Sequence, residues 1–150
     1  MTKQTRYVLG LMFNADRSAV VLIRKLKPAW QAGLLNGIGG KIEDGETERE
    51  GMVREFTEET GFQTDPEHWR EFCQLQGDEF VVYCFTATSQ YSYVCANTQE
   101  NERIEKTLVA NLGLVSCVSN LTWLIHAALD DNNGKRFYIT SRYSHPFQLG

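Results

Sequence analysis

The chain has 150 residues, in which 15 Lys and Arg face 19 Asp and Glu for a formal net charge of -4. This length predicts one domain, residues 1–150, with a core of its own. An acidic balance without a basic run argues against an extended nucleic-acid surface, because such surfaces neutralise phosphates with Lys and Arg. A small nucleotide remains compatible, since a metal ion can meet its charge.

The cysteines and the N-terminal segment indicate the compartment. The four cysteines contain no C-x-x-C pair, so they support neither a zinc cluster nor a redox motif, and we expect buried free thiols at Cys73, Cys84, Cys95 and Cys117. The N-terminal segment lacks the charged-then-apolar layout of a signal peptide, and no apolar run approaches the length of a membrane span. These features favour a reducing, cytoplasmic setting without a membrane partner.

The N-terminal part of the chain predicts a hairpin and then a loop. Residues 6–13 and 19–24 are strand-like, and polar turn residues at 14–18 join them. Residues 25–33 follow as a loop that contains Trp30, just before a glycine-rich turn. This position predicts that Trp30 lies near any substrate, where it either stacks on a base or packs against the edge of the core.

Signals for both ends of a helix follow the glycine-rich turn. Thr47 and Glu50 have the spacing of a capping box, and Gly61 is a helix-ending glycine. At about 100° per residue, the helix between them has one apolar arc and one acidic arc. The apolar arc contains Met52, Val53, Phe56 and Thr60, and the acidic arc contains Glu55, Glu58 and Glu59.

The acidic arc requires compensation, because like charges at i,i+4 destabilise a helix. Arg54 is spaced to offset part of the repulsion, but it cannot neutralise all of the acids. Mg²⁺ could do so, since this cation prefers oxygen ligands shared between carboxylates and substrate phosphates. The alternative is an ordinary solvated acidic face.

Spacing favours the metal. The nine residues Gly40, Glu46, Arg54, Glu55, Phe56, Glu58, Glu59, Gly61 and Phe62 reproduce the pattern G-x5-E-x7-R-E-U-x-E-E-x-G-U, with U a bulky apolar residue. The chain therefore resembles the Nudix hydrolase family. The resemblance implies an α+β fold, an α/β/α sandwich with a mixed β-sheet between helices. It also implies a hydrolase of nucleoside diphosphates linked to another group, with Mg²⁺, or Mn²⁺ in its place, as cofactor.

Residue roles carried over from the family are expectations of the same kind. The resemblance implies that Glu55, Glu58 and Glu59 bind metal together with the carbonyl oxygen of Gly39. Arg54 would then orient the glutamates. Glu46 would support the turn or the outer shell of the metal, and Lys41 could face a phosphate.

Residues 35–41 are similar to the W-N-G-x-G-G-K segment of the Nudix enzymes that hydrolyse oxidised purine nucleoside triphosphates. Asn36 matches the asparagine that contacts the base in those enzymes, whereas Leu35 replaces the tryptophan. Two interpretations of Asn36 remain open. It contacts the base, or it serves the backbone conformation of the turn.

The second half of the chain supplies the remaining elements. Residues 63–76 suggest a strand or irregular element packed on the acidic helix, residues 79–88 a central strand, and residues 89–98 a strand or a lid. Residues 107–114 are predicted to form a strand that leads into a turn. A helix is expected at 121–129 with Asn120 as its cap, then a turn at 131–134 and a final strand at 137–140.

Two further site residues come from this half of the chain. Family members often carry another metal-site or base glutamate after the central strand. Glu102 fits that position best, with Glu100 and Glu105 as rivals. Asn120 falls where the oxidised-purine enzymes carry a base-reading aspartate, and this departure weakens the assignment to guanine.

The expected reaction is hydrolysis of a phosphoanhydride bond by a metal-activated water, with Glu58 or Glu102 as the base. The first choice of substrate is an oxidised purine dNTP such as 8-oxo-dGTP. ADP-ribose, dinucleoside polyphosphates, nucleotide sugars and RNA 5′ ends are the alternatives among substrates, and a non-catalytic nucleotide sensor is the alternative of another class. The partner is thus a small nucleotide, and monomer and homodimer both remain open.

Overall fold

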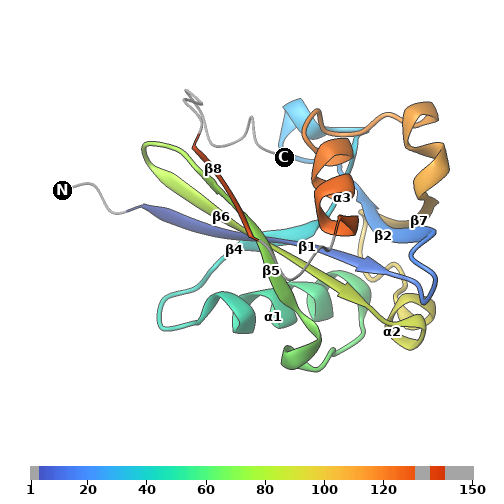
Figure 1. Cartoon of the computed structure of the whole chain (residues 1–150), viewed down its shortest axis with the longest axis horizontal. Helices are drawn as coiled ribbons and strands as arrows, with labels where there is room; N and C mark the ends of the chain where they lie inside the picture. The colour runs from blue at the N-terminus through green and yellow to red at the C-terminus, as the bar shows by residue number, and fades with distance from the viewer. Residues whose placement is uncertain (1–3, 131–135, 141–150) are drawn as a thin grey trace.

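A computed structural model describes residues 4–130 and 136–140 of the chain. Within these residues eight strands form one mixed sheet with helices on both faces (Figure 1). The strands are β1 (Thr5–Phe13), β2 (Ala19–Arg24), β3 (Leu35–Asn36), β4 (Ile38–Lys41), β5 (Arg70–Gln76), β6 (Phe80–Thr88), β7 (Arg103–Leu108) and β8 (Phe137–Thr140). The helices are α1 (Glu48–Thr60), α2 (Gln90–Cys95) and α3 (Leu121–Leu129), with short 3-10 helices η1 (Ala29–Gln31), η2 (Pro66–His68) and η3 (Val109–Leu114).

Strand β1 organises the sheet. Along its whole length it pairs in parallel with β6. On its other edge it pairs antiparallel with β4 over Tyr7–Gly10, and with β2 at Met12 and Phe13. Through β2 the sheet continues to β3 and β7, and through β6 it continues to β5 and β8. The glycine-rich strand β4 is therefore held at the middle of the sheet.

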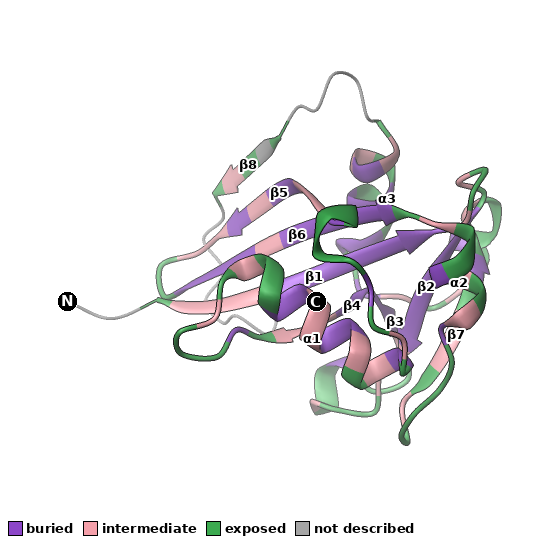
Figure 2. Cartoon of the chain, turned by 90° about the horizontal axis from the view of Figure 1, so that it is seen from below, coloured by how far each residue is buried: buried purple, intermediate pink, exposed green. Residues whose placement is uncertain are grey.

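Residues Val8–Phe13 of β1 are all buried (Figure 2), and since successive side chains point to opposite faces of a sheet, both faces of this part of the strand are covered. Leu9, Leu11 and Phe13 belong to the core that includes residues of α3. Val8 and Met12 belong to the core that includes residues of α1. The two cores and the helices on both faces confirm the predicted α+β sandwich.

Gly10 shows how closely α1 packs on the sheet. A Cβ atom at this position would lie 2.5 Å from Cε of Met52 on α1. Phe56, one turn further along α1, meets the ring of Trp69 edge-on at 5.4 Å between centroids. The prediction that residues 63–76 pack on the acidic helix is thus confirmed, and they do so as η2 followed by β5.

For residues 89–98 the strand alternative is wrong, and for residues 107–114 only the first two residues belong to a strand. Residues 89–98 contain helix α2, whose N-terminus is capped by Ser89: its hydroxyl accepts a hydrogen bond from the Ser92 N–H at 3.1 Å. Residues 107–114 are mostly the 3-10 helix η3, and the strand of this region, β7, begins four residues earlier. Strand β7 ends at Leu108 because its partner there is Ala19, the first residue of β2. Beyond that point no strand within residues 4–130 and 136–140 extends the ladder.

The other sequence predictions have mixed outcomes. The hairpin, the helix at 121–129 and the last strand are confirmed. Asn120 lies at the cap position of α3, but its side chain makes no capping hydrogen bond. All four thiols are free, yet only Cys73 and Cys84 are buried, whereas Cys95 and Cys117 are half-buried. The turn predicted at 131–134 lies outside the described residues.

Candidate functional site

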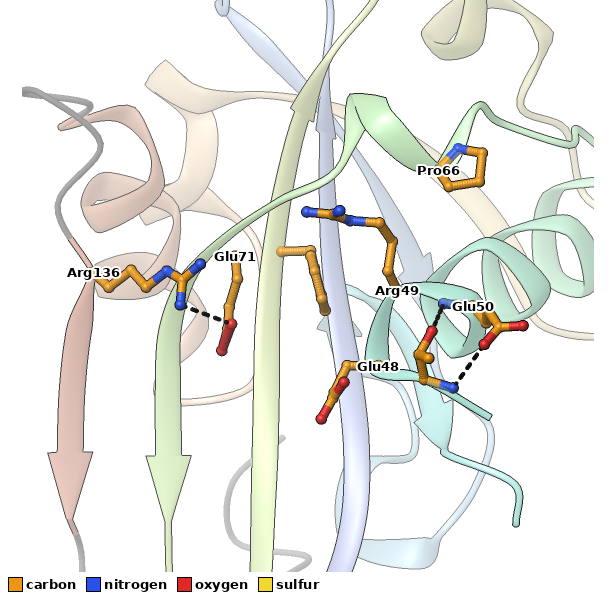
Figure 3. A pocket seen from close by; sticks show the side chains of 8 residues that line it. Glu48, Arg49, Glu50, Pro66, Glu71 and Arg136 are labelled. Carbon is orange, nitrogen blue, oxygen red and sulfur yellow. Dashed lines mark hydrogen bonds and ion pairs between the residues drawn. The ribbon is translucent and has the colours of Figure 1, made fainter. Parts of the chain in front are cut away.

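Helix α1 begins and ends as its sequence predicts. The Thr47 hydroxyl accepts a hydrogen bond from the Glu50 N–H at 3.1 Å, and the Glu50 carboxylate accepts one from the Thr47 N–H at 3.0 Å (Figure 3). Gly61 ends the helix in the left-handed region with φ 77°. These fixed ends set the rotation of the helix, so that Glu55 turns toward the sheet while Glu58 faces solvent.

Arg54 binds the carboxylates around it. Its guanidinium donates two hydrogen bonds to Glu46, at 2.7 and 3.0 Å, and one to Glu55 at 3.0 Å. Contacts to Glu58 are longer, at 3.4 Å, and a further N–H donates to the backbone carbonyl of Lys41 at 3.0 Å. Arg54 therefore joins the end of β4 and the turn before the helix to the acidic face.

Glu46 also holds the turn before the helix. Its carboxylate accepts a hydrogen bond from the Glu43 N–H at 3.0 Å, in addition to the two from Arg54. These bonds lower the pKa of Glu46, with the bond from Arg54 as the largest cause. Glu46 thus occupies the turn-stabilising position expected of it.

Glu55 is the buried carboxylate of the site, with 8% of its surface exposed. It lies against Gly40 of β4, and a Cβ atom at Gly40 would clash with both carboxylate oxygens and the carbon between them. Burial raises the pKa of Glu55 to about 7, although the bond from Arg54 acts in the opposite direction. A proton therefore competes with any bound cation for this carboxylate near neutral pH.

Glu58 and Glu59 differ in surroundings. The Glu58 side chain is 57% exposed, whereas Glu59 is half-buried. Burial raises the pKa of Glu59, the positive charge of Lys25 lowers it, and the charges of Glu102, Glu100 and Glu58 raise it again. Glu59 therefore lies on the side of α1 that faces the loop after β2 and the segment before β7.

The carboxylates of Glu55, Glu58 and Glu59 are suitable ligands for a hard cation, but they do not converge on one point. Across the part of the chain that the structure describes, no three acidic, His or Cys side chains converge closely enough to hold a metal. Arg54 holds Glu55 by a hydrogen bond at 3.0 Å, whereas Glu58 is exposed and Glu59 is half-buried on another side of the helix. The carboxylate donors and the side-chain-free space at Gly40 nevertheless suit Mg²⁺, which takes few protein ligands and keeps its waters and substrate oxygens.

A hollow of about 510 Å³ lies beside the acidic face. Two cationic residues, Lys41 and Arg54, line it together with Glu55 and Glu58, and the acidic turn after β4 completes its wall. The hollow thus offers both positive side chains and carboxylates, which suits a metal-bound phosphate. A second hollow, at the N-terminus of α1, contains the 3.6 Å ion pair between Arg136 and Glu71 and none of the predicted site residues (Figure 3).

Asn36 is buried and serves the turn. Its side-chain N–H donates to the Gln31 side chain at 3.2 Å, and its oxygen accepts from the Gly37 N–H at 2.8 Å. This geometry corresponds to the conformational alternative for Asn36 in the metal-free chain. Gln31, buried and equally part of this contact, was not indicated by any sequence signal.

Trp30 and Asn120 are the other two predicted base-binding residues besides Asn36. Trp30 is in η1 with 37% of its surface exposed, and Asn120 is buried. The segment before Asn120 is fastened to β3, because the Val118 N–H donates to the Leu35 carbonyl at 3.0 Å. The structure therefore brings the segment before Asn120 beside Leu35, the residue before Asn36.

The three candidate glutamates in and just before β7 have different surroundings. Glu105 forms a two-bond ion pair with Arg24, both distances being 2.7 Å, and Glu100 is exposed. Glu102 accepts hydrogen bonds from the backbone N–H groups of Leu26 and Lys27, and from the ammonium of Lys25. Glu102 and Lys25 are both close enough to Glu59 for their charges to act on it.

A family model described as NUDIX domain matches residues 3–138. The chain belongs to the Nudix hydrolase family. Its Nudix domain is 38% identical over 68 residues to the oxidized purine nucleoside triphosphate hydrolase of Mus musculus, covering 45% of this chain and 42% of that protein. It is 34% identical over 74 residues to the 8-oxo-dGTP diphosphatase of Escherichia coli, covering 49% and 55%. The chain thus spans about half the length of these relatives.

The Nudix fold is also seen in a solved structure. The NUDIX domain of Shewanella oneidensis NrtR, complexed with ADP ribose, superimposes with a TM-score of 0.67 at 16% identity, covering 87% of this chain and 89% of that one. This likeness concerns the fold. In addition, no helix within residues 4–130 and 136–140 is long and apolar enough to cross a membrane.

Proposed function

We propose that this Nudix protein is a Mg²⁺-dependent hydrolase of nucleoside triphosphates, with oxidised purine dNTPs such as 8-oxo-dGTP as the preferred class. The observation that carries the proposal is the arrangement on α1, where Glu55 is buried against Gly40 and bound by Arg54 while Glu58 lines an open hollow of about 510 Å³. The substrate class is supported by the names of the two relatives to which part of the chain is similar.

The proposed site uses Glu55, Glu58, Glu59 and the carbonyl oxygen of Gly39 to hold Mg²⁺, or Mn²⁺ in its place. When bound, such a cation neutralises phosphate oxygens and lowers the pKa of a coordinated water. Arg54 fixes Glu55 and the end of β4, so the ligands are oriented before the substrate arrives. Lys41, which lines the same hollow, meets a phosphate of the substrate.

Glu58 is the proposed proton acceptor. It is exposed at the rim of the hollow, and its contacts to Arg54 are long, so its carboxylate can reach a water. The water oxygen forms a bond to phosphorus and the phosphoanhydride P–O bond breaks. The proton of the water passes to Glu58, and the products are a nucleoside monophosphate and pyrophosphate.

We assign recognition of the base to residues outside the metal site, namely Trp30, Asn36 and Asn120. We assign stacking on a purine to the exposed part of Trp30, and reading of the purine edge to the amide groups of Asn36 and Asn120. An amide both donates and accepts hydrogen bonds, so it can read a purine edge where a carboxylate can only accept. In this proposal Asn36 exchanges its bond to Gln31 for one to the base.

ADP-ribose hydrolysis or sensing is the second candidate, because a protein of the same fold is complexed with ADP ribose. The deciding experiment measures phosphate and pyrophosphate release with Mg²⁺ across dNTPs, 8-oxo-dGTP, ADP-ribose, dinucleoside polyphosphates, nucleotide sugars and a short triphosphorylated RNA. Turnover greatest with 8-oxo-dGTP supports the proposal. Greater turnover of another class replaces the substrate, and binding without turnover moves the assignment to a sensor.

Alanine substitutions at the two adjacent glycines of β4, Gly39 and Gly40, are expected to affect different properties, the first stability and the second metal binding. A Cβ atom at Gly39 would clash with the backbone carbonyl of Val8, which cannot move without breaking the sheet. A Cβ atom at Gly40 would instead displace the Glu55 carboxylate. Gly39→Ala should therefore lower the free energy of unfolding by roughly 1–3 kcal/mol. Gly40→Ala should weaken Mn²⁺ binding by about tenfold or more, in the range seen when the support of a ligand is removed.

Thermal unfolding and Mn²⁺ titration of both variants test this difference. Gly113→Ala is the matched control, since a Cβ atom there meets nothing within 4 Å. A Gly40→Ala protein that binds Mn²⁺ as tightly as the parent would remove Glu55 from the metal site.

A further inference from the structure

The carboxylate of Glu102 is bound by the loop that follows β2. One of its oxygens accepts a hydrogen bond from the Leu26 N–H at 2.7 Å and a longer one from the Lys27 N–H at 3.4 Å. The other oxygen meets the Lys25 ammonium at 3.1 Å. Both charged side chains are largely buried, with 14% and 19% of their surface exposed. This contact is therefore well protected from water.

The loop held in this way, residues 25–34, is closed at its base. The Lys25 N–H donates to the Leu34 carbonyl at 2.9 Å, and the Gly33 N–H donates to the Lys25 carbonyl at 2.8 Å. Arg24, just before the loop, donates to the Gly33 carbonyl at 3.0 Å and forms its ion pair with Glu105 on β7. The loop is thus a closed unit whose outer side is fastened to β7 and to the residue before it.

This unit contains residues of the proposed substrate site. It includes η1 with Trp30 and with Gln31, whose side chain accepts the hydrogen bond from Asn36. Its base also reaches the acidic helix, because the charge of Lys25 acts on Glu59. A shift of the loop would therefore move Trp30 and Gln31, which belong to the proposed base-binding site. It would at the same time withdraw the positive charge of Lys25 from Glu59, a proposed metal ligand.

We propose that Glu102 is a positioning residue, which with Lys25 forms a clasp that locks the 25–34 loop against β7 and so holds Trp30 and Gln31 in position. Its catalytic consequence rests on the proposed hydrolase function; the clasp itself does not. Three donors, all from residues 25–27, bind the carboxylate, so Glu102 is oriented toward the loop. Proton transfer is left to Glu58.

Amide hydrogen exchange tests the clasp without any substrate. Glu102→Ala removes the acceptor of the Leu26 and Lys27 N–H groups, so both amides should exchange about tenfold faster or more. Lys25→Met should give a smaller increase at the same two amides. Glu100→Gln, an exposed acid in the same segment, is the matched control and should leave both unchanged. Unchanged exchange at Leu26 in Glu102→Ala would overturn the clasp.

Steady-state kinetics test its role in the reaction. A positioning role predicts that Glu102→Ala and Lys25→Met each raise KM about tenfold with kcat within about threefold of the parent, and that the double variant is no worse than the more affected single one. If Glu102 were instead the general base, kcat would fall by about 10²–10⁴-fold in Glu102→Ala and not in Lys25→Met. That result would overturn the positioning role. A parent protein without turnover would contradict only the proposed function, because the exchange measurement would still report the clasp.

Discussion

Replacing Glu58 with glutamine is expected to lower the kcat for Mg²⁺-dependent hydrolysis by about 10²–10⁴-fold, the range for removal of a general base. The amide cannot accept the proton of the attacking water, and it is a weaker metal ligand than a carboxylate. Because the Glu58 side chain is 57% exposed and its bonds to Arg54 are long, the fold should tolerate the change. The melting temperature of the metal-free protein should therefore stay close to that of the parent.

The matched control for this change is Glu67→Gln, an exposed glutamate in η2 outside the acidic face. Initial rates of pyrophosphate release with 8-oxo-dGTP and Mg²⁺, measured for the parent and both variants, decide the outcome. Loss of turnover in Glu58→Gln alone supports the assignment. Retention of more than about a tenth of the parent kcat would move the proton acceptor to another group, given the usual size of this effect.

Replacing Arg54 with methionine is expected to have the largest effect on stability. The change removes the cation that binds Glu46 and the buried Glu55, and breaking a buried pair from one side typically costs about 3–5 kcal/mol. Protonation of Glu55 limits the loss, because burial already raises its pKa to about 7. A decrease of about 2–4 kcal/mol in the free energy of unfolding is therefore expected near neutral pH.

The same variant should depend on pH in a defined direction. Without Arg54 the pKa of Glu55 rises further, so the folded state keeps a proton that the unfolded state loses above its own, ordinary pKa. The stability contributed by that proton is lost as the pH rises through the folded pKa. Denaturant unfolding should consequently show a greater loss for Arg54→Met at pH 8.5 than at pH 5.5.

Arg49→Met is the control for this pH dependence, since Arg49 is an exposed arginine on the same helix. Its effect on stability should be small and similar at both pH values. A pH-independent loss in Arg54→Met would show that the arginine acts by packing its side chain and not through the charge of Glu55.

The sequence predicted most where the signals are local. The ends of α1 depend on Thr47, Glu50 and Gly61, which lie within or beside the helix that they bound. The acidic face follows from the helical period alone. The burial of both faces of β1 likewise agrees with its continuous apolar run. These features were therefore predictable without knowledge of the tertiary structure.

The errors arose where distant segments decide the structure. The sequence of α2 contains two Tyr and a Val, which favour strands, yet the sheet ends beside it: the Ser89 N–H makes its bond to the carbonyl of Phe13, the last residue of β1. In the same way β7 ends where β2 begins. Lys25 and Gln31 belong to no motif, and only the folded chain shows that they contact Glu102 and Asn36.

The parallel pairing of β1 with β6 also has a consequence for biosynthesis. Thr5, near the start of the chain, lies opposite Phe80, and Phe13 lies opposite Thr88. Contacts between residues so far apart form slowly, because a long loop must close before they contribute. During translation the central strand of the sheet remains open on one edge until Thr88 has left the ribosome. The acidic helix is therefore synthesised well before the sheet beneath it is complete, and a nascent chain that stops short of β6 cannot assemble the metal site on its finished support.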